Sequence, residues 1–460
     1  MALMQTDSVL QQFRRDPFQQ ALIAILGFLI SIRMFYPGLM SNDSVDQYGQ
    51  ALRFSFSDWH PPIMAFVWAL TNDWIAGPLG MLMLFCGLYW GALFLLSLSV
   101  SRHGKRPAIA FLVLGFAPWA IGNLGSIWKD VFHAVLTLFA VALAVLALGN
   151  GKQARSKPGL AALVLLLIAS MLRFNALVIL PPLLWLFLGR PRLNNWKTLS
   201  LLVVLPLLVL VLSSAFTYGF LRAERSGVHS SLLIYDIGAV SKATGTNAFG
   251  QSFGPEGEQK LKTTCYDDTA WDSYAWGSCA FLMPAVKASG LWGSDALMRS
   301  WVHAIGTHPG AYARHRFTHW WNLLWKPKHL LLSEMQSNSW GYEFNKSSLH
   351  RTLERVTDIL RDAPFYRPGA WFFFAIALAA VAARWGKGPS RDIVIALNVS
   401  AVLYLLSYLP IGVASDFRYA YWSILASWFS LPLLWIALKQ ARSAPPAKLQ
   451  RDPAPLVAAL

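Results

Sequence analysis

Long apolar runs separated by short polar loops account for most of the chain. Each run approaches the ~20 residues that a helix needs to cross a hydrocarbon core about 30 Å thick. The spans predicted on this basis cover residues 18–38, 79–100, 108–123, 131–149, 159–172, 175–189, 198–219, 370–385, 393–412 and 419–438. The pattern therefore predicts an all-α polytopic membrane protein with about ten transmembrane helices.

Two polar regions interrupt this pattern. The first, residues 39–77, contains a short apolar piece at 61–76 that opens with a proline pair, and we interpret that piece as an interfacial helix. The second, residues 220–368, has Gly and Ser clusters with helix-like runs, which predict a mostly helical extracytoplasmic domain. The expected parts are an N-terminal transmembrane module, this domain, C-terminal transmembrane helices and a cytoplasmic tail, at residues 1–219, 220–368, 369–438 and 439–460.

Composition and charge agree with this class. Hydrophobic residues make up 55% of the chain and charged residues 13%, against roughly 45–50% and 25% in soluble domains. The net charge of +16 comes from short Lys/Arg clusters in alternate loops, which argues against nucleic acid as a partner. The positive-inside rule puts these clusters and both termini in the cytoplasm, with a plasma (inner) membrane as the expected location. The outward-facing segments are then residues 39–77, 121–130, 172–175, 220–368 and 412–418.

The first outward loop gathers ionisable side chains directly after the first span. Its members are Asp43, Asp46, Asp58 and His60. A concentration of ionisable side chains at the outer end of a membrane span is typical of a functional site. A structural role is equally open for Asp43, as the N-cap of an amphipathic helix. Asp43 and His60 are also candidate metal ligands, but two ligands do not define a metal site.

Charged residues at the outward ends of later spans are further candidates. Lys129 and Asp130 begin one span, where a mutual ion pair and a contact with lipid phosphate are equally open. Arg173 interrupts an apolar stretch, and it either ends two short spans or binds an anionic headgroup. Arg418 poses the same choice, with Asp416 nearby as an internal partner.

The long polar region adds two features. One helical face carries His308, Tyr312, Arg316 and His319, at spacings of four, four and three. The default interpretation is a solvated amphipathic helix that lies on the membrane; contact of its cationic face with lipid phosphate is the alternative, and Arg316 is a candidate for substrate binding. Cys265 and Cys279 can form a bridge if the region faces an oxidising compartment.

Three stretches resemble motifs of the GT-C glycosyltransferases, which are integral membrane enzymes that transfer a sugar from a polyprenyl-phosphate carrier. The resemblance is to bacterial relatives of protein mannosyltransferases and aminoarabinose transferases. SNDSVDQYGQA is similar to the acidic motif of their first loop, SDWHPPIMAFVWAL to the segment after it, and IWKDVFH to the second loop. The likeness is best over the first 190 residues or so. It implies a GT-C-like fold, with Asp43 at the first-loop catalytic acid position and Asp130 at the second.

The chain departs from the family pattern at two points. The usual Asp-Glu pair of the first loop reads Asp43-Ser44, and Asp46 is placed to take over part of its role, so the choice between the two aspartates stays open. His60 stands where some relatives carry another polar residue.

The resemblance implies hexosyl or pentosyl transfer from a polyprenyl-phosphate donor in the membrane lipid to an extracytoplasmic envelope glycan, glycolipid or protein. A carboxylate is the expected general base. Lys129, Arg173 and Arg418 would offset the charge of the departing lipid phosphate. His60 and Asp58 are further candidates for substrate contact. No cofactor is required, and a divalent metal is optional.

Two other functions compete with this one. A lipid or lipid-linked glycan flippase would also be helical, but transporters usually place polar groups near the bilayer midplane in paired repeats, which this chain lacks. A glycan ligase or polymerase would share the layout of many spans and one large outer loop. An acidic first loop favours simple sugar transfer over the ligase, for which an Arg-dominated outer loop is expected. No GxxxxGK[ST] nucleotide-binding loop and no HExxH motif is present, so nucleotide chemistry of the soluble type is not expected.

Overall fold

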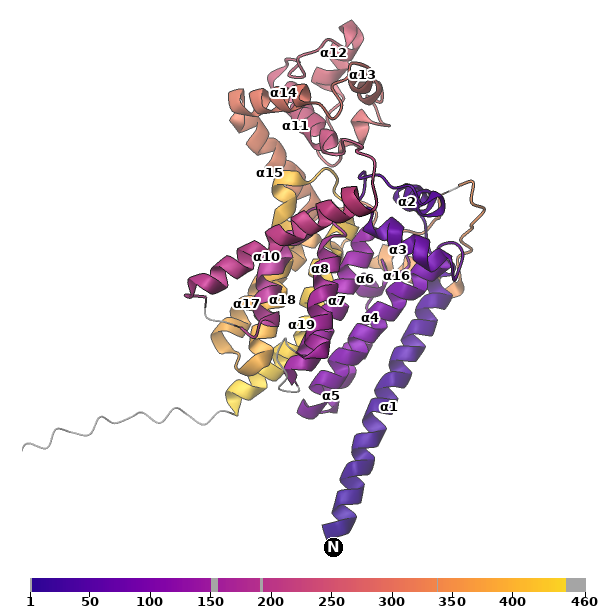
Figure 1. Ribbon diagram of the computed structural model, residues 1–460, viewed down its shortest axis with the longest axis vertical. Coiled ribbons are helices and arrows are strands. Elements are labelled where there is room, and N and C mark those ends of the chain that lie inside the picture. The colour runs from indigo at the N-terminus through magenta and orange to yellow at the C-terminus, as the bar shows by residue number, and fades with distance from the viewer. Residues whose placement is uncertain (1, 150–155, 191–192, 337, 444–460) are drawn as a thin grey trace, which may run out of the picture.

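The computed structural model describes residues 2–149, 156–190, 193–336 and 338–443 and is built from helices over these ranges (Figure 1). Seven of the described helices are long and apolar enough to cross a membrane. They are α1 (Ala2–Phe35), α4 (Leu79–Val100), α7 (Lys129–Gly149), α10 (Trp196–Ser214), α17 (Pro368–Trp385), α18 (Gly388–Ile411) and α19 (Tyr421–Arg442). The predicted all-α polytopic class is confirmed, while the count of ten spans stays a prediction. Residues 444–460 of the expected tail lie outside the described ranges.

The remaining elements are shorter. The α-helices among them are α2 (Asn42–Arg53), α3 (Ile63–Asn72), α5 (Lys105–Leu114), α6 (Pro118–Ile121), α8 (Lys157–Ser170), α9 (Leu180–Phe187), α11 (His229–Thr244), α12 (Gly254–Thr263), α13 (Leu282–Ala288), α14 (Asp295–Thr307), α15 (Pro309–Trp325) and α16 (Ser348–Leu360). The single-turn and irregular helices are η1 (Ser101–His103), η2 (Ala176–Ile179), η3 (Ala215–Phe220), η4 (Trp271–Tyr274), η5 (Pro364–Tyr366) and η6 (Phe417–Ala420).

The span predicted at residues 108–123 is wrong as a continuous helix. It divides into α5 and α6, because Ala117 is extended and Pro118 opens a new helix. The break frees carbonyl groups that buried tyrosines then satisfy. Tyr89 donates to the carbonyl of Gly115 at 2.8 Å, and Tyr421 donates to that of Ala120 at 2.5 Å. Apolar residues continue through the break, so hydropathy alone does not reveal it.

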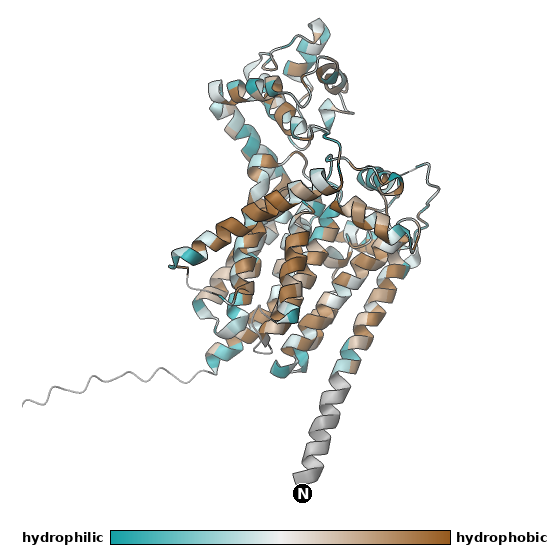
Figure 2. Ribbon diagram, viewed as in Figure 1, coloured by the Kyte–Doolittle hydropathy of each residue, from teal (hydrophilic) through white to brown (hydrophobic). Residues whose placement is uncertain are grey.

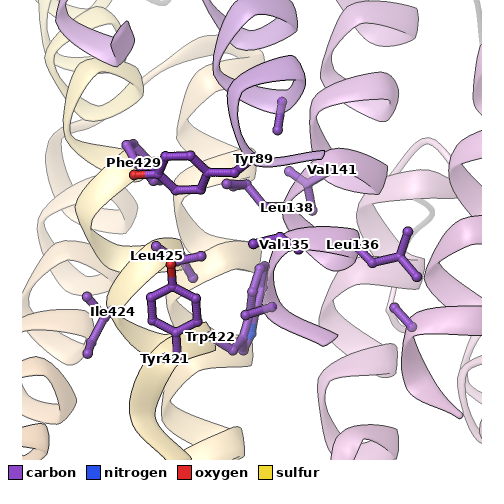
Figure 3. Packing of buried hydrophobic residues seen from close by; sticks show 14 of the residues in the cluster. Tyr89, Val135, Leu136, Leu138, Val141, Tyr421, Trp422, Ile424, Leu425 and Phe429 are labelled. Carbon is purple, nitrogen blue, oxygen red and sulfur yellow. The ribbon is translucent and has the colours of Figure 1, made fainter. Parts of the chain in front are cut away.

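The centre of the bundle is formed by α7 and α19, the two most enclosed of the seven long helices. Figure 3 shows their contact, where Val135 and Leu138 of α7 face Leu425 of α19, with Tyr89 of α4 above them. The outer faces of the bundle helices are apolar (Figure 2), as a lipid-facing surface requires. Since α7 begins with Lys129 and the last span begins near Arg418, both central helices present charged residues at their starts.

A lobe of α11 to α14 stands at one end of the bundle, and α15 leads from it toward the membrane helices (Figure 1). The lobe has its own apolar core, separate from that of the bundle. Cys265 and Cys279, left open by the sequence, are joined in a disulfide within it. The lobe is more polar than the bundle (Figure 2), which agrees with a position outside the lipid.

Two segments connect the lobe end to the bundle. Residues 326–336 and 338–347, which we term the return segment, fold back over α2. The N–H of Gln336 donates to the carbonyl of Met40 at 2.8 Å, and the hydroxyls of Tyr342 and Tyr48 lie 3.2 Å apart. Residues 412–417, which we term the strap, join α18 to α19. The strap is bonded on one side to the lobe and on the other to the return segment.

Candidate active site

The first loop is fastened directly to the start of α7. Leu39 and Ser126 form a parallel backbone bridge, in which Leu39 N–H donates to the carbonyl of Gly125 and Ile127 N–H donates to that of Leu39, each at 2.9 Å. Ser44 Oγ donates to the Ile127 carbonyl at 2.7 Å, and Trp128 Nε1 donates to Ser41 Oγ at 2.7 Å. These bonds hold α2 beside the first residues of α7.

The N-cap of α2 is Ser41, so the expectation that Asp43 caps this helix is wrong. Ser41 is extended, and its N–H donates to the hydroxyl of Ser44 at 3.1 Å in a capping box. Asp43 lies in the first turn instead, where the helix dipole favours a negative charge. Because the cap is supplied by serine, the Asp43 carboxylate is left for other partners.

Three side chains surround the Asp43 carboxylate. Arg418 NH1 lies 3.0 Å from Oδ2, and His60 Nε2 lies 3.7 Å from Oδ1. The other nitrogen of His60, Nδ1, lies 2.5 Å from Lys129 Nζ. The side chain of Asp43 remains 31% exposed, whereas those of His60 and Arg418 are 10% and 12% exposed. The carboxylate is thus held from within the protein and open to an incoming molecule.

Electrostatics keep this carboxylate charged. Burial by itself would raise the pKa of Asp43, but Arg418, His60 and Lys129 together outweigh it and hold that pKa well below its ordinary range, with Arg418 contributing most of the three. Burial, together with the charge of Lys129, lowers the pKa of His60 to about 3, so the ring is neutral near pH 7. Nδ1 of His60 faces Lys129, and Nε2 faces Asp43.

Arg418 is itself fixed by a second carboxylate and two aromatic rings. Its Nε donates to Asp416 Oδ2 at 3.1 Å, which confirms the internal partner expected from the sequence. The guanidinium lies 4.4 Å from the ring centre of Trp128 and 5.3 Å from that of Tyr419. The other oxygen of Asp416 lies 2.9 Å from Nδ1 of His329, an exposed residue of the return segment. Arg418 is therefore positioned rather than free to swing.

Asp130 and Arg173 form a buried ion pair with each other. The Asp130 side chain is 2% exposed and that of Arg173 is 10% exposed. Arg173 Nε also donates to Asn175 at 3.1 Å, and its guanidinium lies 4.9 Å from the ring centre of Tyr419. Because the same tyrosine ring borders Arg418, the two arginines are neighbours. Asp130 compensates a buried positive charge and is shielded from solvent.

A groove opens beside these charges. It has a volume of about 190 Å³ and lies between the proline pair of the first loop, the end of α8 and the exposed helix α10. Its apolar wall includes Met171, Phe174, Leu177, Val209 and Leu210. Arg173 lies on the groove as well, so the groove and the charged group share a residue.

Asp58 marks the polar side of the same groove. Its carboxylate accepts from the Tyr218 hydroxyl at 2.8 Å and from the N–H and hydroxyl of Ser226 at 2.6 Å each. Burial opposes ionisation, but these donors lower the pKa of Asp58 below its ordinary value. The residue ties the first loop to the segment after α10, and it lines the groove rather than touching Asp43.

Two predicted site residues lie apart from this group. Asp46 is exposed on α2, and its carboxylate accepts from Gln50 Nε2 at 2.8 Å. Arg316 is buried on α15 against the lobe, where NH2 lies 2.5 Å from Asp236 of α11 and NH1 donates to the carbonyl of Gly412 at 2.6 Å. The expected solvated face is wrong for Arg316 and for His319, because both are buried. Their positions form the joint between lobe and strap.

The sequence did not single out Trp128, Tyr419 or His329. The two aromatic residues adjoin Lys129 and Arg418 in the chain, and that adjacency was the available signal. His329 had none, because its contact with Asp416 joins residues 87 positions apart.

Metal binding is not supported by a third ligand. Asp43 and His60 face each other, but Arg418 occupies one carboxylate oxygen and Lys129 the other ring nitrogen. Over the described ranges, no three His, Cys, Asp or Glu side chains are grouped to hold a metal ion.

No protein-family model and no curated protein sequence matches the chain. Two solved structures of an oligosaccharyltransferase from Archaeoglobus fulgidus are similar to it in fold. One is AglB in complex with an inhibitory peptide and a dolichol-phosphate, with 14% identity and a TM-score of 0.38 over 93% of this chain and 52% of that chain. The other is an apo form, with 16% identity and a TM-score of 0.40 over 92% and 51%. This chain spans about half the length of those proteins, and the likeness extends no further than the course of the helices.

Proposed function

We propose that the protein is a membrane glycosyltransferase of the GT-C type, which moves a sugar from a polyprenyl-phosphate carrier to an acceptor hydroxyl outside the cytoplasm. One observation carries the proposal. An ionised, partly exposed carboxylate, Asp43, is paired with Arg418, and the neighbouring cation Arg173 lines an apolar groove. A lipid phosphate needs such cations, and its tail needs such a groove.

The donor is proposed to enter from the lipid along the groove between α8 and α10. Its polyprenyl chain lies against the apolar wall, and its phosphate lies toward Arg173 and Lys129. Arg173 is already paired with Asp130, so the phosphate meets a compensated guanidinium that is fixed in orientation. Arg418 remains with Asp43 and Asp416 and adds positive potential without leaving its partners.

The chemical step follows from this placement. The acceptor oxygen attacks the anomeric carbon of the donor sugar and forms the new C–O bond. The bond between that carbon and the phosphate oxygen breaks, and its electron pair stays on the polyprenyl phosphate. The acceptor proton passes to Asp43, and the cations offset the charge that develops on the leaving phosphate. His60 Nε2, which faces Asp43, steadies it during this transfer.

The sidedness of the protein belongs to the same proposal. The outward loops predicted by the positive-inside rule, residues 39–77, 121–130, 172–175 and 412–418, supply all the charged residues of the site at one end of the bundle. We place this end and residues 220–368 outside the plasma membrane, with both termini in the cytoplasm. The disulfide of the lobe favours an oxidising compartment.

The test is sugar transfer in liposomes with radiolabelled polyprenyl-phosphate sugars and crude envelope acceptors. Asp43→Asn is expected to lower kcat by about 10²–10⁴-fold, the usual contribution of a general base. Asp46→Asn, a matched change one turn along α2, is expected to retain transfer. Wild-type turnover in Asp43→Asn would remove this residue from the mechanism. Movement of labelled lipid between leaflets without any transfer would make the protein a flippase.

A further inference from the structure

We infer that the acceptor of this reaction is a carbohydrate, held by Trp276 and Asp272 at the lobe side of the site. The inference rests on the proposed function and adds the chemical class of its acceptor. It starts from the segment between Cys265 and Cys279, which reads CYDDTAWDSYAWGSC. The disulfide closes this segment into a loop, and η4 lies within it.

The strap sets this loop beside the active site. Ala270 and Ala414 form an antiparallel backbone bridge, and Trp271 N–H donates to the carbonyl of Val413 at 2.9 Å. Asp416 and Arg418 follow only a few residues later in the chain. Burial raises the pKa of Asp272, and the negative charges of Asp416 and Asp43 raise it further.

A chain of indole rings connects the first loop to this exposed edge. Trp59, which precedes His60, has its ring centre 6.2 Å from that of Trp271 and 6.1 Å from that of Trp292, on which it stacks. The ring of Trp271 lies 6.1 Å from that of Trp276. Trp59 is half-buried and Trp271 is buried, whereas Trp276 at the end of the chain is 66% exposed.

Trp276 is exposed yet held in place. Its backbone N–H donates to the Asp272 carbonyl at 2.9 Å, and its indole faces the Asp272 carboxylate closely enough to oppose the rise in the pKa of that carboxyl. An exposed tryptophan of this kind leaves a large apolar face in water, which is favourable to cover. The result is a fixed flat apolar surface with a carboxylate at its edge.

This pairing matches the chemistry of a sugar ring. A pyranose presents C–H groups on its face and hydroxyls at its edge, so an indole covers the first and a carboxylate accepts from the second. An extended peptide is a poorer match, because Ala270 and Trp271, which could pair with it, already use their backbone groups on the strap. A saccharide bound here would lie beside the active site, because the ring of Trp271 links Trp276 to Trp59, the residue before His60.

The first test measures saccharide binding by full-length protein in nanodiscs, by calorimetry, with neutral disaccharides of glucose, mannose or galactose as probes. We expect wild type to bind at least one of them. Trp276→Ala and Asp272→Asn should each weaken that binding about tenfold or more, and Trp276→Phe should retain most of it. Trp74→Ala removes another exposed tryptophan, 89% exposed beyond α3, and serves as the matched control with unchanged binding.

The second test is kinetic. In the transfer assay, Trp276→Ala should raise KM for a saccharide acceptor about tenfold and leave KM for the donor unchanged. Failure of every disaccharide to bind wild type, or equal binding by Trp276→Ala, would overturn the inference. Two other results would also overturn the inference. One is sugar transfer to a Ser/Thr pentapeptide that depends on Trp276, and the other is a loss of binding to phosphatidylglycerol vesicles in Trp276→Ala. If wild type and Trp276→Ala both hydrolyse the polyprenyl-phosphate sugar, the proposed glycosyltransferase activity is retained even where the inference about the acceptor fails.

Discussion

Replacement of Asp130 by Asn separates a structural role from a catalytic one. The resemblance to the GT-C enzymes implies that Asp130 is a second acid, whereas the structure buries it against Arg173 with only 2% of its side chain exposed. Removing one partner of a buried ion pair typically costs about 3–5 kcal/mol, because the other charge is left uncompensated. Asp130→Asn should therefore lower the free energy of unfolding by about this amount.

The expected shift in melting temperature follows from the chain length. Unfolding entropy is about 2.1 cal/mol/K per residue, so the 460 residues give about 1 kcal/mol/K and the single variant should melt on the order of 3–5 °C lower. The double variant Asp130→Asn/Arg173→Gln removes both charges, and its melting temperature should recover toward wild type. It should also raise KM for the donor, because Arg173 is the proposed phosphate contact.

The assay is thermal unfolding in one nanodisc composition, followed by transfer kinetics on the same samples. An unchanged melting temperature in Asp130→Asn, or a double variant no more stable than the single one, would refute the structural role. A fall in kcat of a hundredfold or more in a normally stable Asp130→Asn would instead make Asp130 a catalytic acid, as the resemblance implies.

Three further outcomes are expected. The hydrogen bond to Asp416 raises the pKa of His329, so this pair stabilises the fold fully below pH 6.5 and loses that contribution as the pH rises through the folded-state pKa. The difference in melting temperature between wild type and His329→Gln should therefore be larger at pH 5.5 than at pH 8.5. An equal difference at the two pH values would refute this. Asp58→Asn replaces one carboxylate oxygen by an NH2 group, which faces the three N–H and O–H groups that bond to Asp58. Because these groups then lose an acceptor, KM for the polyprenyl-phosphate sugar should rise several-fold with kcat unchanged, measured by initial rates. The low pKa of Asp43 depends on Arg418, so Arg418→Gln should move the acid limb of the pH–rate profile upward, and a profile identical to wild type would contradict that cause.

Hydropathy predicted the bundle well because lipid imposes a simple requirement of length and polarity. The span at 79–100 coincides with α4, and the span at 18–38 overlaps the apolar part of α1. The failure at 108–123 has a physical cause. Buried tyrosine hydroxyls satisfy the backbone of the broken helix, and these come from α4 and α19, far away in sequence.

The candidate site was predictable in its members but not in its pairings. Charges at outward loop ends were visible in the sequence, and the structure brings Asp43, His60, Lys129 and Arg418 together. Which charge compensates which depends on contacts over long sequence separations. Arg316 shows this most plainly, since its periodic spacing predicted a face but could not reveal Asp236, 80 positions earlier, as the partner that buries it.

The strap has a consequence for engineering by domain exchange. Its six residues bond to the lobe through Trp271, to α15 through Arg316 and to the return segment through Lys328, and they then continue into Arg418. A chimaera that replaces the lobe alone would sever the bond through Trp271 and loosen the segment that leads to the arginine paired with the base. A functional graft therefore has to carry residues 412–417 with the lobe, although more than eighty positions separate the two in the chain.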